Sequence, residues 1–408
     1  MSEPLSVLPY GRQDIDDDDL AAVAAVLRSD FLTTGPLPPA FEAALAARLG
    51  VPHAVVCSSA TAGLHIAAMA LDLQPGERVV VPAVTFLATA NTPHLCGAEI
   101  VFADVDPDSG LMRPQDLEAA LARADGPVRA VFPVHLNGQC VDLPSIAALA
   151  ETQGLSVVED ASHALGTRYR GGGNRAEDSE IAVGACAHAD MAVFSFHPVK
   201  TIAMGEGGAV TTRDPERAAR LARLRNHGMD REAGHMTEAT AAFDTAGQAN
   251  PWYYEMHEIG LNYRASDIHC ALGLSQLGKL DRLMARRRDL VARYDAVLAP
   301  LAPLVTPIAR MPWCEATWHL YAVLIDFERL GLERAEVMRR LRARGVGTQV
   351  HYIPLHLQPY YRQRYGQLSL PGAERYYARC LSLPLHTRVT DDDVERVAEA
   401  LTALVERA

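Results

Sequence analysis

Short apolar runs alternate with segments of helical spacing through the first half of the chain. Each run is followed by a stretch whose apolar residues recur every three or four positions. Such runs, separated by helices of about ten residues, are typical of crossover units in a mainly parallel sheet that is covered on both faces. The pattern predicts an α/β fold, with strands at residues 54–57, 78–82, 99–105, 128–134, 155–161, 191–196 and 207–212.

Three further segments lie outside this alternation. Residues 14–28 have helical spacing and an acidic first turn that suits the helix dipole, which predicts a surface helix. Residues 229–251 carry no periodic signal and indicate a surface insertion or mobile loop. Residues 266–299 contain no proline and allow one helix up to about 50 Å long, which Gly273 and Gly278 could bend.

The C-terminal stretch predicts a smaller α+β domain. We expect its strands near residues 320–326, 346–350 and 380–384, and its helices near residues 333–343 and 390–406. The whole chain then divides into an N-terminal arm and helix at residues 1–33, a large domain at 34–265, and a bridging helix with a small domain at 266–408.

Composition narrows the class of protein. At about 150 residues per domain, 408 residues suggest two or three structural units. Apolar residues make up 49% and charged residues 22%, which excludes a disordered or fibrous chain. The formal charge of −12 argues against general binding to nucleic acid or to a membrane surface. An anionic ligand therefore needs a local site.

The spacing of the cysteines and the length of the apolar runs indicate the cellular compartment of the protein. Seven cysteines occur without any CxxC pair, so reduced thiols in the cytosol fit best. The N-terminal residues show no basic region followed by an apolar one, and no apolar run reaches the roughly 18 residues that span a bilayer. We expect a cytoplasmic protein.

Two charged residues lie directly after predicted strands. Asp160 ends the run LSVVED at the carboxyl edge of the sheet, where open α/β sheets bind ligands, although a turn cap is an alternative. Lys200 lies between MAVFSF and the glycines of GEGG, where removal from water would favour Schiff-base chemistry; an exposed loop lysine has the same pattern. Together they match pyridoxal phosphate, which needs an amine for its aldehyde and a carboxylate for its pyridinium proton.

A phosphate site and a ring clamp are predicted at the same edge. Residues 58–61, Ser-Ser-Ala-Thr, follow a strand and open a helix, so backbone N–H groups and hydroxyls converge where the helix dipole favours an anion. Plain N-capping would use only one of these hydroxyls. Phe86 follows RVVVP and could stack on a planar heterocycle, although a lone phenylalanine is more often part of the core.

Several motifs, taken in order, are shared with one known family. They are TTGP at residues 33–36, SSAT at 58–61, EDASHALG at 159–166, FSFHPVK at 194–200 and GLNYR at 260–264. From about residue 8 to about residue 400 the chain resembles the sugar aminotransferases of the DegT/DnrJ/EryC1/StrS family. The resemblance implies a pyridoxal-phosphate-dependent transferase of fold type I, like aspartate aminotransferase, that works as a homodimer with active sites at the subunit interface.

The resemblance also implies roles for individual residues. Lys200 would bind the aldehyde of pyridoxal 5′-phosphate, Asp160 would pair with its pyridine nitrogen, and His163 would lie near its phenolic oxygen. Phe86 would stack on the ring. The phosphate would be bound by Ser59, Ala60, Thr61 and Ser195 of the same chain, and by Asn262 of the partner subunit. The sugar nucleotide would contact Tyr10, Asp30, Phe31, Leu32, Thr33, Ser59, Ser195, Asn262, Trp318, His319, Leu320 and Tyr321.

Two positions depart from the usual residues of the family. SSAT stands where many relatives have Asn-Ser-Gly-Thr, and His163 stands where many have glutamine. For the two phosphates of the nucleotide we expect cationic partners among Arg225, His227 and Arg264, with ordinary surface arginine as the alternative.

Within the family, SDFLTTGP, PWYYE, WHLY and VHYIPLHLQPYY resemble the branch that works in pseudaminic acid biosynthesis. That branch implies transfer of an amino group from L-glutamate to the 4-keto carbon of a UDP-linked 4-keto-6-deoxy-N-acetylhexosamine. The alternatives are a keto sugar of the bacillosamine or legionaminic type, a dehydratase, and a non-catalytic regulator. Family dehydratases have histidine in place of the lysine, so Lys200 favours transamination.

Two other classes of enzyme fit less well. Gly171, Gly173 and Ala176 match the GxGxxA pattern of dinucleotide-binding proteins, but no apolar helix follows them. A metal hydrolase is disfavoured because HExxH is absent, and we expect no resident metal. His351 and His356 flank a proline; they either line the mouth of the site or belong to the polar surface.

Overall fold

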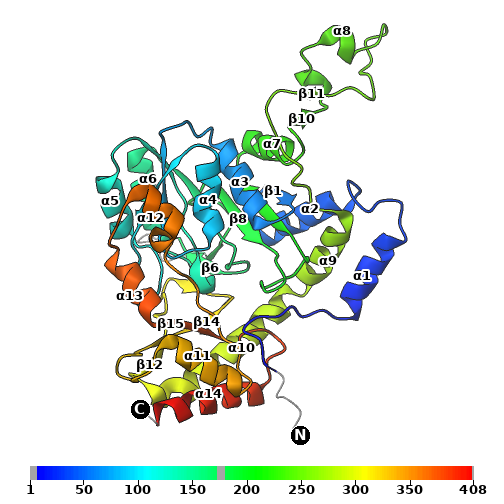
Figure 1. Ribbon diagram of the computed structural model, residues 1–408. Helices are drawn as coiled ribbons and strands as arrows, with labels where there is room; N and C mark the ends of the chain where they lie inside the picture. The colour runs from blue at the N-terminus through cyan, green and yellow to red at the C-terminus, as the bar shows by residue number, and fades with distance from the viewer. Residues whose placement is uncertain (1–6, 172–179, 407–408) are drawn as a thin grey trace.

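The computed structural model describes residues 7–171 and 180–406, and a seven-stranded sheet forms its centre (Figure 1). Neighbouring strands are parallel except at β9, which is antiparallel to both of its neighbours. All residues of the central strands β5 and β8 are buried, and because successive side chains alternate in direction, both faces of the sheet are covered. The strand order is β1 (His53–Cys57), β9 (Gly208–Thr212), β8 (Met191–Ser195), β5 (Ser156–Asp160), β4 (Val128–Val131), β2 (Arg78–Pro82) and β3 (Glu99–Ala103). The predicted α/β class is confirmed.

Helices connect these strands in the predicted alternation. Polar residues at the strand ends begin several of them: Ser59 caps α3 through the backbone N–H of Ala62, and Asp214 caps α7. The connecting helices are α3 (Ala60–Ala70), α4 (Leu87–Leu95), α5 (Pro114–Arg123) and α6 (Leu143–Gln153), with the 3₁₀ turn η1 (Leu136–Gly138). Helix α2 (Leu37–Leu49) precedes β1, and helix α7 (Pro215–Leu224) follows β9.

A second sheet lies in the C-terminal part, at the bottom of Figure 1, and has its own apolar core. It pairs β14 (Tyr321–Ile325) antiparallel with β12 (Val305–Pro307) and β15 (Cys380–Leu383). The core includes Tyr294, Val323, Leu341 and Leu401. The helices that pack on this core include α11 (Arg334–Ala343) and α14 (Asp391–Val405), with the 3₁₀ turn η3 (Ala299–Leu301). Helices α12 (Pro359–Tyr365) and α13 (Pro371–Arg379) and the 3₁₀ turn η4 (Leu355–Leu357) contribute instead to the core of the large sheet.

The long helix expected at residues 266–299 is divided in two. Helix α9 (Asp267–Gly278) and helix α10 (Leu280–Leu298) meet at Lys279, whose backbone angles of −101° and 0° break the helix directly after Gly278. The Lys279 ammonium pairs with Asp19, 2.9 Å away, in helix α1 (Asp17–Leu27). The interruption therefore follows Gly278, one of the two glycines at which a bend was expected, and it coincides with a charged contact to the N-terminal helix.

The strand expected at residues 346–350 is absent. Val346 and Gln349 form only isolated bridges, to Leu8 and to Ser382. An extended strand needs a continuous ladder of backbone hydrogen bonds, and these residues find a partner at single points only. The chain here turns instead toward a cavity beside the large sheet.

The segment without periodicity forms a surface projection. It begins after α7 and stands away from the rest of the molecule, at the top of Figure 1. The short strands β10 (Met229–Asp230) and β11 (Glu255–Met256) pair at its base, and it also holds η2 (Ala233–His235) and α8 (Ala239–Ala242). The carboxylate of Glu255 accepts hydrogen bonds from the backbone N–H groups of Thr237 and Glu238, which fixes the loop. The predicted surface insertion is confirmed.

A third sheet pairs β6 (Arg168–Arg170) with β7 (Glu180–Ala182) and β13 (Cys314–Glu315). Of the GxGxxA match, Gly171 follows β6, whereas Gly173 and Ala176 lie outside the described residues. Within residues 7–171 and 180–406, no helix is both long and apolar enough to cross a membrane.

Candidate active site

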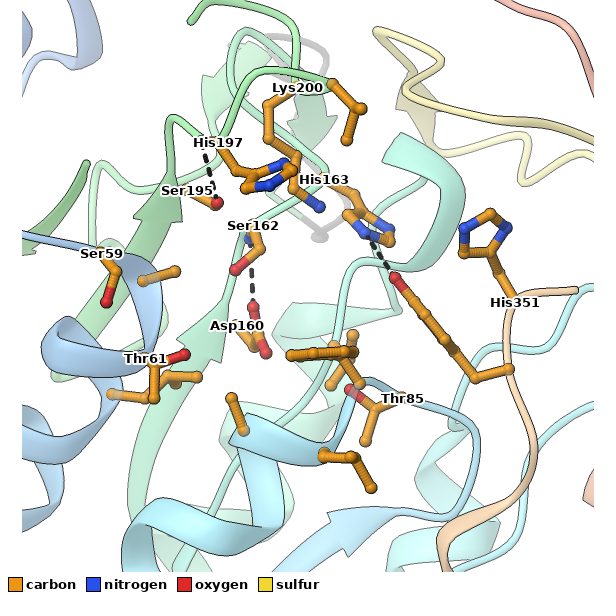
Figure 2. Close-up of a pocket in the computed structure, with 18 of the residues that line it drawn as sticks. Ser59, Thr61, Thr85, Asp160, Ser162, His163, Ser195, His197, Lys200 and His351 are labelled. Atoms are coloured by element: carbon orange, nitrogen blue, oxygen red, sulfur yellow. Dashed lines mark hydrogen bonds between the residues drawn. The ribbon is translucent and has the colours of Figure 1, made fainter. Parts of the chain in front are cut away.

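A cavity of about 570 Å³ opens at the carboxyl ends of β5 and β8 (Figure 2). Strand ends of the large sheet, the first turn of α3 and residues 349–355 of the C-terminal part line it together. The predicted residues that it collects are Tyr10, Ser59, Ala60, Thr61, Phe86, Asp160, His163, Ser195, Lys200 and His351. The predicted residues therefore meet at a cavity at the carboxyl edge of the sheet, which is where open α/β sheets bind ligands.

Asp160 forms one side of this cavity. Its Oδ2 accepts a hydrogen bond from the hydroxyl of Thr89 at 2.7 Å, and its Oδ1 accepts one from the backbone N–H of Ser162 at 3.1 Å. Thr89 belongs to α4, and its hydroxyl is 2.8 Å from that of Thr85. These contacts orient a carboxylate that is only 5% exposed, so it can face a cationic ring nitrogen without competing water.

Lys200 lines the same cavity as the first turn of α3. Removal from water lowers the pKa of its ammonium group to about 7, although the carboxylate of Asp160 opposes the shift. Its Nζ is 3.4 Å from Nε2 of His319. An amine with a pKa near neutrality has its lone pair available, which a nucleophile or proton carrier requires. The alternative of an exposed loop lysine is wrong.

His163 is a buried, neutral hydrogen-bond donor. The backbone N–H of Asn137 donates to its Nδ1 at 3.3 Å, which assigns the ring proton to Nε2. Nε2 is 3.2 Å from the hydroxyl of Tyr352 (Figure 2). Burial and the neighbouring Lys200 hold the pKa of His163 well below its ordinary value. The Nε2–H is a hydrogen-bond donor, as is the side-chain amide of the glutamine that many relatives have at this position.

The first turn of α3 forms an anion cradle. Ser59 accepts the cap hydrogen bond from the N–H of Ala62 at 3.1 Å, so the capping role is present, while Thr61 remains exposed to the cavity beside it. Strand β9 passes directly beneath: a Cβ on Gly208 would lie 2.5 Å from the backbone carbon of Ser59. Ser195 ends β8 nearby. A helix N-terminus with hydroxyls facing a cavity suits a phosphate.

Phe86 lies at the rim of the cavity. Its side chain is 54% exposed, so the alternative of a core residue is wrong. The centre of its ring is 6.0 Å from that of Tyr352. Tyr10 also reaches this side, with its ring centre 5.3 Å from His351. A planar ligand can therefore be held between aromatic side chains from different parts of the chain.

The residues of the WHLY motif are divided between two places. His319 is buried and contacts Lys200, whereas Leu320 and Tyr321 are buried away from this cavity, and Tyr321 belongs to the core of the small sheet. Trp318 packs under the guanidinium of Arg310, 4.0 Å from the ring centre. None of the four residues Trp318, His319, Leu320 and Tyr321 lines the cavity, and only His319 is connected to it, through its contact with Lys200.

Other predicted residues also lie elsewhere. Asn262 forms an isolated bridge with Asn226 and is not part of the cavity. The segment between α1 and α2 is exposed at the surface and does not line the cavity either; it contains Asp30, Phe31, Leu32 and Thr33.

A second cavity, of about 470 Å³, lies next to that segment and is lined by Thr34, Arg225 and Arg264. Arg225 pairs with Glu42 and donates to the carbonyl of Val56, so it is not a free surface arginine. Arg264 donates to the side chain of Asn226. His227 lines neither of these two cavities.

The two histidines left open by the sequence have different places. His351 is 7% exposed, lines the cavity and contacts the hydroxyl of Ser382 through Nδ1 at 2.8 Å. Burial and Lys200 lower the pKa of His351 to about 3. His356 is 2% exposed, lies outside the cavity and faces Glu374. The polar-surface alternative is wrong for both, and His351 lines the site.

Sequence reasoning missed Tyr352 and Thr89. Tyr352 lies in the motif VHYIP, whose only signal was its place beside His351. Thr89 lies in the first turn of α4, four positions after Thr85, which precedes the helix. Neither pattern by itself indicates a contact with a residue that lies far away in the sequence.

The fold and this site define a pyridoxal-phosphate-dependent enzyme of fold type I. The chain belongs to the DegT/DnrJ/EryC1/StrS aminotransferase family, whose model matches residues 13–402. It is a sugar aminotransferase.

Solved structures agree with this family. Helicobacter pylori PseC, described as an aminotransferase involved in the biosynthesis of pseudoaminic acid, is 30% identical over 99% of this chain and 100% of its own, with a TM-score of 0.86. DesV from S. venezuelae is 33% identical over 96% of this chain and 95% of its own, with a TM-score of 0.81. Spr1654 of Streptococcus pneumoniae, a putative sugar aminotransferase solved in its PLP form, is 27% identical over 98% of this chain and 99% of its own, with a TM-score of 0.85.

Proposed function

We propose that this protein transfers an amino group from L-glutamate to the 4-keto carbon of a UDP-linked 4-keto-6-deoxy-N-acetylhexosamine, in pseudaminic acid biosynthesis. The observation that carries the chemistry is the pair of Lys200 and Asp160 in one cavity beside an anion cradle. The similarity to H. pylori PseC over the whole chain supports the choice of substrate. A keto sugar of the bacillosamine or legionaminic type is the second candidate, because other sugar aminotransferases are similarly close.

The residues present fit pyridoxal 5′-phosphate. The glycine at position 208 leaves room for the α3 N-terminus, where Ser59, Ala60 and Thr61 would hold the phosphate together with Ser195. Phe86 would stack on the ring, and Asp160 would pair with its nitrogen. When bound, the cofactor withdraws electrons from the α-carbon of an attached amino acid, which no side chain can do.

Lys200 would carry the proton in both halves of the reaction. Its lowered pKa leaves a fraction of the amine neutral near pH 7. Nζ can therefore take a proton from the α-carbon of the donor and deliver it to the carbon of the cofactor's aldehyde group. His319 Nε2 lies within hydrogen-bond distance and orients the amine. Asp160, held by Thr89, would face the ring nitrogen, and His163 would offer its Nε2–H toward the phenolic side.

We infer a homodimer with shared sites. Asn262 belongs to the expected phosphate set, yet it lies outside the cavity of its own chain, which is the arrangement expected of a residue that serves the neighbouring subunit. The projecting segment and its base also expose large apolar side chains, as an obligate interface requires: Trp252, Met256 and Ile259. We assign residues 34–265 to cofactor binding, residues 266–408 to the bridging helices and small domain, and residues 1–33 to an N-terminal arm.

The first test concerns the lysine. Lys200→Ala should remain folded, lack the visible absorbance of the loaded enzyme and have no turnover, because no other residue of the cavity offers an amine. The wild-type protein should be yellow, and L-glutamate should bleach its visible band. A wild type that binds pyridoxal phosphate but is never bleached by an amino donor would indicate a non-catalytic regulator instead.

The second test concerns the sugar. The epimer that is accepted depends on which face of the keto sugar meets the cofactor, and residues around the cavity decide this rather than the catalytic pair. We expect a higher kcat/KM with UDP-2-acetamido-2,6-dideoxy-β-L-arabino-hexos-4-ulose than with the D-xylo epimer under identical conditions. A preference for the D-xylo sugar would overturn the pseudaminic acid assignment and leave the aminotransferase class intact.

A further inference from the structure

Arg287 is a buried charge at the joint between the two parts of the molecule. It lies on α10 and is 2% exposed. Its neighbours on the same helix reach acidic partners near the surface: Arg286 pairs with Asp391, and Arg288 pairs with Glu315. Within the described residues, Arg287 has no carboxylate at ion-pair distance, so its charge is balanced by dipoles alone.

Its partners are three backbone carbonyls. Nη1 of Arg287 lies 3.2 Å from the carbonyl oxygens of Trp318, His319 and Leu385. The first two belong to the turn that leads into β14, and the third follows β15. One guanidinium thus ties α10 to two segments of the small sheet that lie far from it in the sequence.

The same turn is held from its other side. The backbone N–H of His319 donates to the carbonyl of Asn137 at 3.0 Å. A Cβ on Gly138 would lie 2.9 Å from the backbone nitrogens of Trp318 and His319, so only glycine allows this approach. Trp318 has a φ of 55°, a conformation that a non-glycine residue keeps only where its surroundings impose it.

This turn aims the His319 ring at Lys200. His319 Nε2 is 3.4 Å from Nζ of Lys200, and its Nδ1 has no partner among the described residues. The ring therefore receives no hydrogen bond that would fix its orientation apart from the lysine contact. Its position depends on the packing of the His163 ring, whose centre is 4.4 Å away, and on the backbone that carries it. Arg287 binds that backbone on both sides of the His319 nitrogen.

The positive charge of Arg287 helps to keep His319 neutral, which an apolar side chain would not do. Burying an unpaired guanidinium is costly, and an apolar side chain of similar volume would fill the space more cheaply. The titratable and charged groups facing His319 are Lys200, His163, His351 and Arg287, and together with burial they hold the pKa of His319 well below its ordinary value. The imidazole stays neutral, so it does not take the proton of the lysine.

We propose that Arg287 is a positioning residue, which holds the neutral imidazole of His319 beside the Lys200 amine by binding the backbone that carries the ring. The proposal rests on the proposed function, since it assigns Arg287 a part in the proton transfers of Lys200. It acts through His319 and does not touch the cavity itself. Loss of Arg287 should therefore slow the reaction only while His319 is present.

A double-mutant comparison tests this dependence. The measured quantity is the rate constant with which saturating L-glutamate bleaches the visible band of the loaded enzyme, for Arg287→Met, His319→Ala and the double variant. A displaced ring should slow Arg287→Met on the order of 10- to 100-fold. The double variant should be no slower than His319→Ala alone, whereas the losses in Tm should add. Wild-type bleaching in Arg287→Met, or rate losses that multiply in the double variant, would overturn the proposal.

A second readout does not depend on activity. Deuterium exchange at the ring C–H of each histidine in the intact protein, followed by digestion and mass spectrometry of the peptide that contains His319, reports the exposure of this ring. In Arg287→Met the exchange at His319 should be several-fold faster than in the wild type. If the wild type is never bleached by L-glutamate, the proposed function fails, while this exchange still tests the position of the ring. Unchanged exchange at His319 would overturn the proposal.

Two further variants separate positioning from stability and from charge. Arg334→Met is the matched control, because Arg334 also donates to backbone carbonyls, those of Tyr377 and Cys380, away from the cavity. It should lower Tm without changing the bleaching rate or the exchange at His319. Arg287→Lys keeps the charge and most of the volume, so it should fold where methionine does not. Its ammonium carries three donors on a shorter stem, so it should fall short of the place that Nη1 takes among the three carbonyls and should stay slow. Full recovery with lysine would overturn the proposal.

Discussion

At the scale of single residues, the site works by holding ionisable groups away from their ordinary charge states. Lys200 has a lowered pKa because it is removed from water, while Asp160 is held by two hydrogen bonds. His163 and His319 are both kept neutral by burial and by the lysine. One amine therefore faces neutral rings on one side and a single carboxylate farther away, which suits a group that must gain and lose a proton.

The lysine predicts a pH dependence of stability. Its pKa is about 7 in the folded protein and 10.5 ordinarily. Between these values the unfolded chain holds a proton on this amine that the folded protein lacks, so the free energy of unfolding should rise with pH across this window. Below about pH 7 the amine is charged in both states and its burial destabilises the fold most.

The measurement compares the cofactor-free wild type with Lys200→Met. Urea unfolding at a series of pH values gives the free energy of unfolding of each protein. The free energy of unfolding of the wild type, relative to that of the variant, should rise as the pH increases from about 7 to 10.5. A difference that stays constant over this range would show that Lys200 titrates normally.

At the scale of elements, the site depends on how closely β9 approaches the start of α3. The glycine cluster before β9 has a specific role here, because backbone atoms of Ser59 and Ala60 lie 2.5 and 2.6 Å from where a Cβ on Gly208 would be. The helix N-terminus can then rest on the strand and direct its N–H groups into the cavity. The spacing of the two elements is therefore part of the phosphate site.

Gly208→Ala should weaken cofactor binding. The added methyl group would push the α3 N-terminus outward, and overpacking of this kind costs about 1–3 kcal/mol. We expect the Kd for pyridoxal 5′-phosphate to rise about tenfold or more, since 1.4 kcal/mol corresponds to a factor of ten. Titration of the apoenzyme, followed by the visible band, measures it.

Gly278→Ala is the matched control for this substitution. A Cβ at Gly278 meets no atom within 4 Å, and the residue lies at the end of α9, away from the cavity. This variant should keep the wild-type Kd. If Gly208→Ala also keeps it, the close approach of strand and helix does not contribute to phosphate binding.

At the scale of the whole molecule, one chain supplies only part of the expected site. The aldehyde and ring partners of the cofactor lie in the cavity, whereas Asn262 lies outside it beside Asn226. The surface segment at residues 30–33 and the cavity of Arg225 and Arg264 also lie apart from Lys200. In the proposed homodimer, a second copy would bring these separate groups to the site of the first.

Mixing two inactive chains tests the shared site. Lys200→Ala lacks the amine, and Asn262→Ala should lack a phosphate partner for the neighbouring subunit. Heterodimers of the two would carry both lesions in one site and neither in the other, so activity should return on mixing, up to about one intact site per heterodimer. Mass spectrometry can show whether the heterodimers form. If they form and stay inactive, each site is built from one chain.

Local sequence determined the large sheet, most helices and the two central groups of the site. Apolar runs that end in Asp160 and precede Lys200 report burial and strand direction, and the carboxyl edge of a parallel sheet brings their ends together. Phe86 and the first turn of α3 followed from the same rule. Periodicity failed where a contact decides the backbone: the expected strand at residues 346–350 has no continuous partner.

Only the tertiary structure decided how the small domain completes the site. His319 lies 119 positions from Lys200, and Tyr352 lies 189 positions from His163, so no local pattern links them. Arg287 stands in the run ARRRD, which reads as a solvated helix face, yet it is buried against three carbonyls while its neighbours reach acidic partners. Helical spacing tells which face is apolar, but only the packing of two domains tells which charge is enclosed between them.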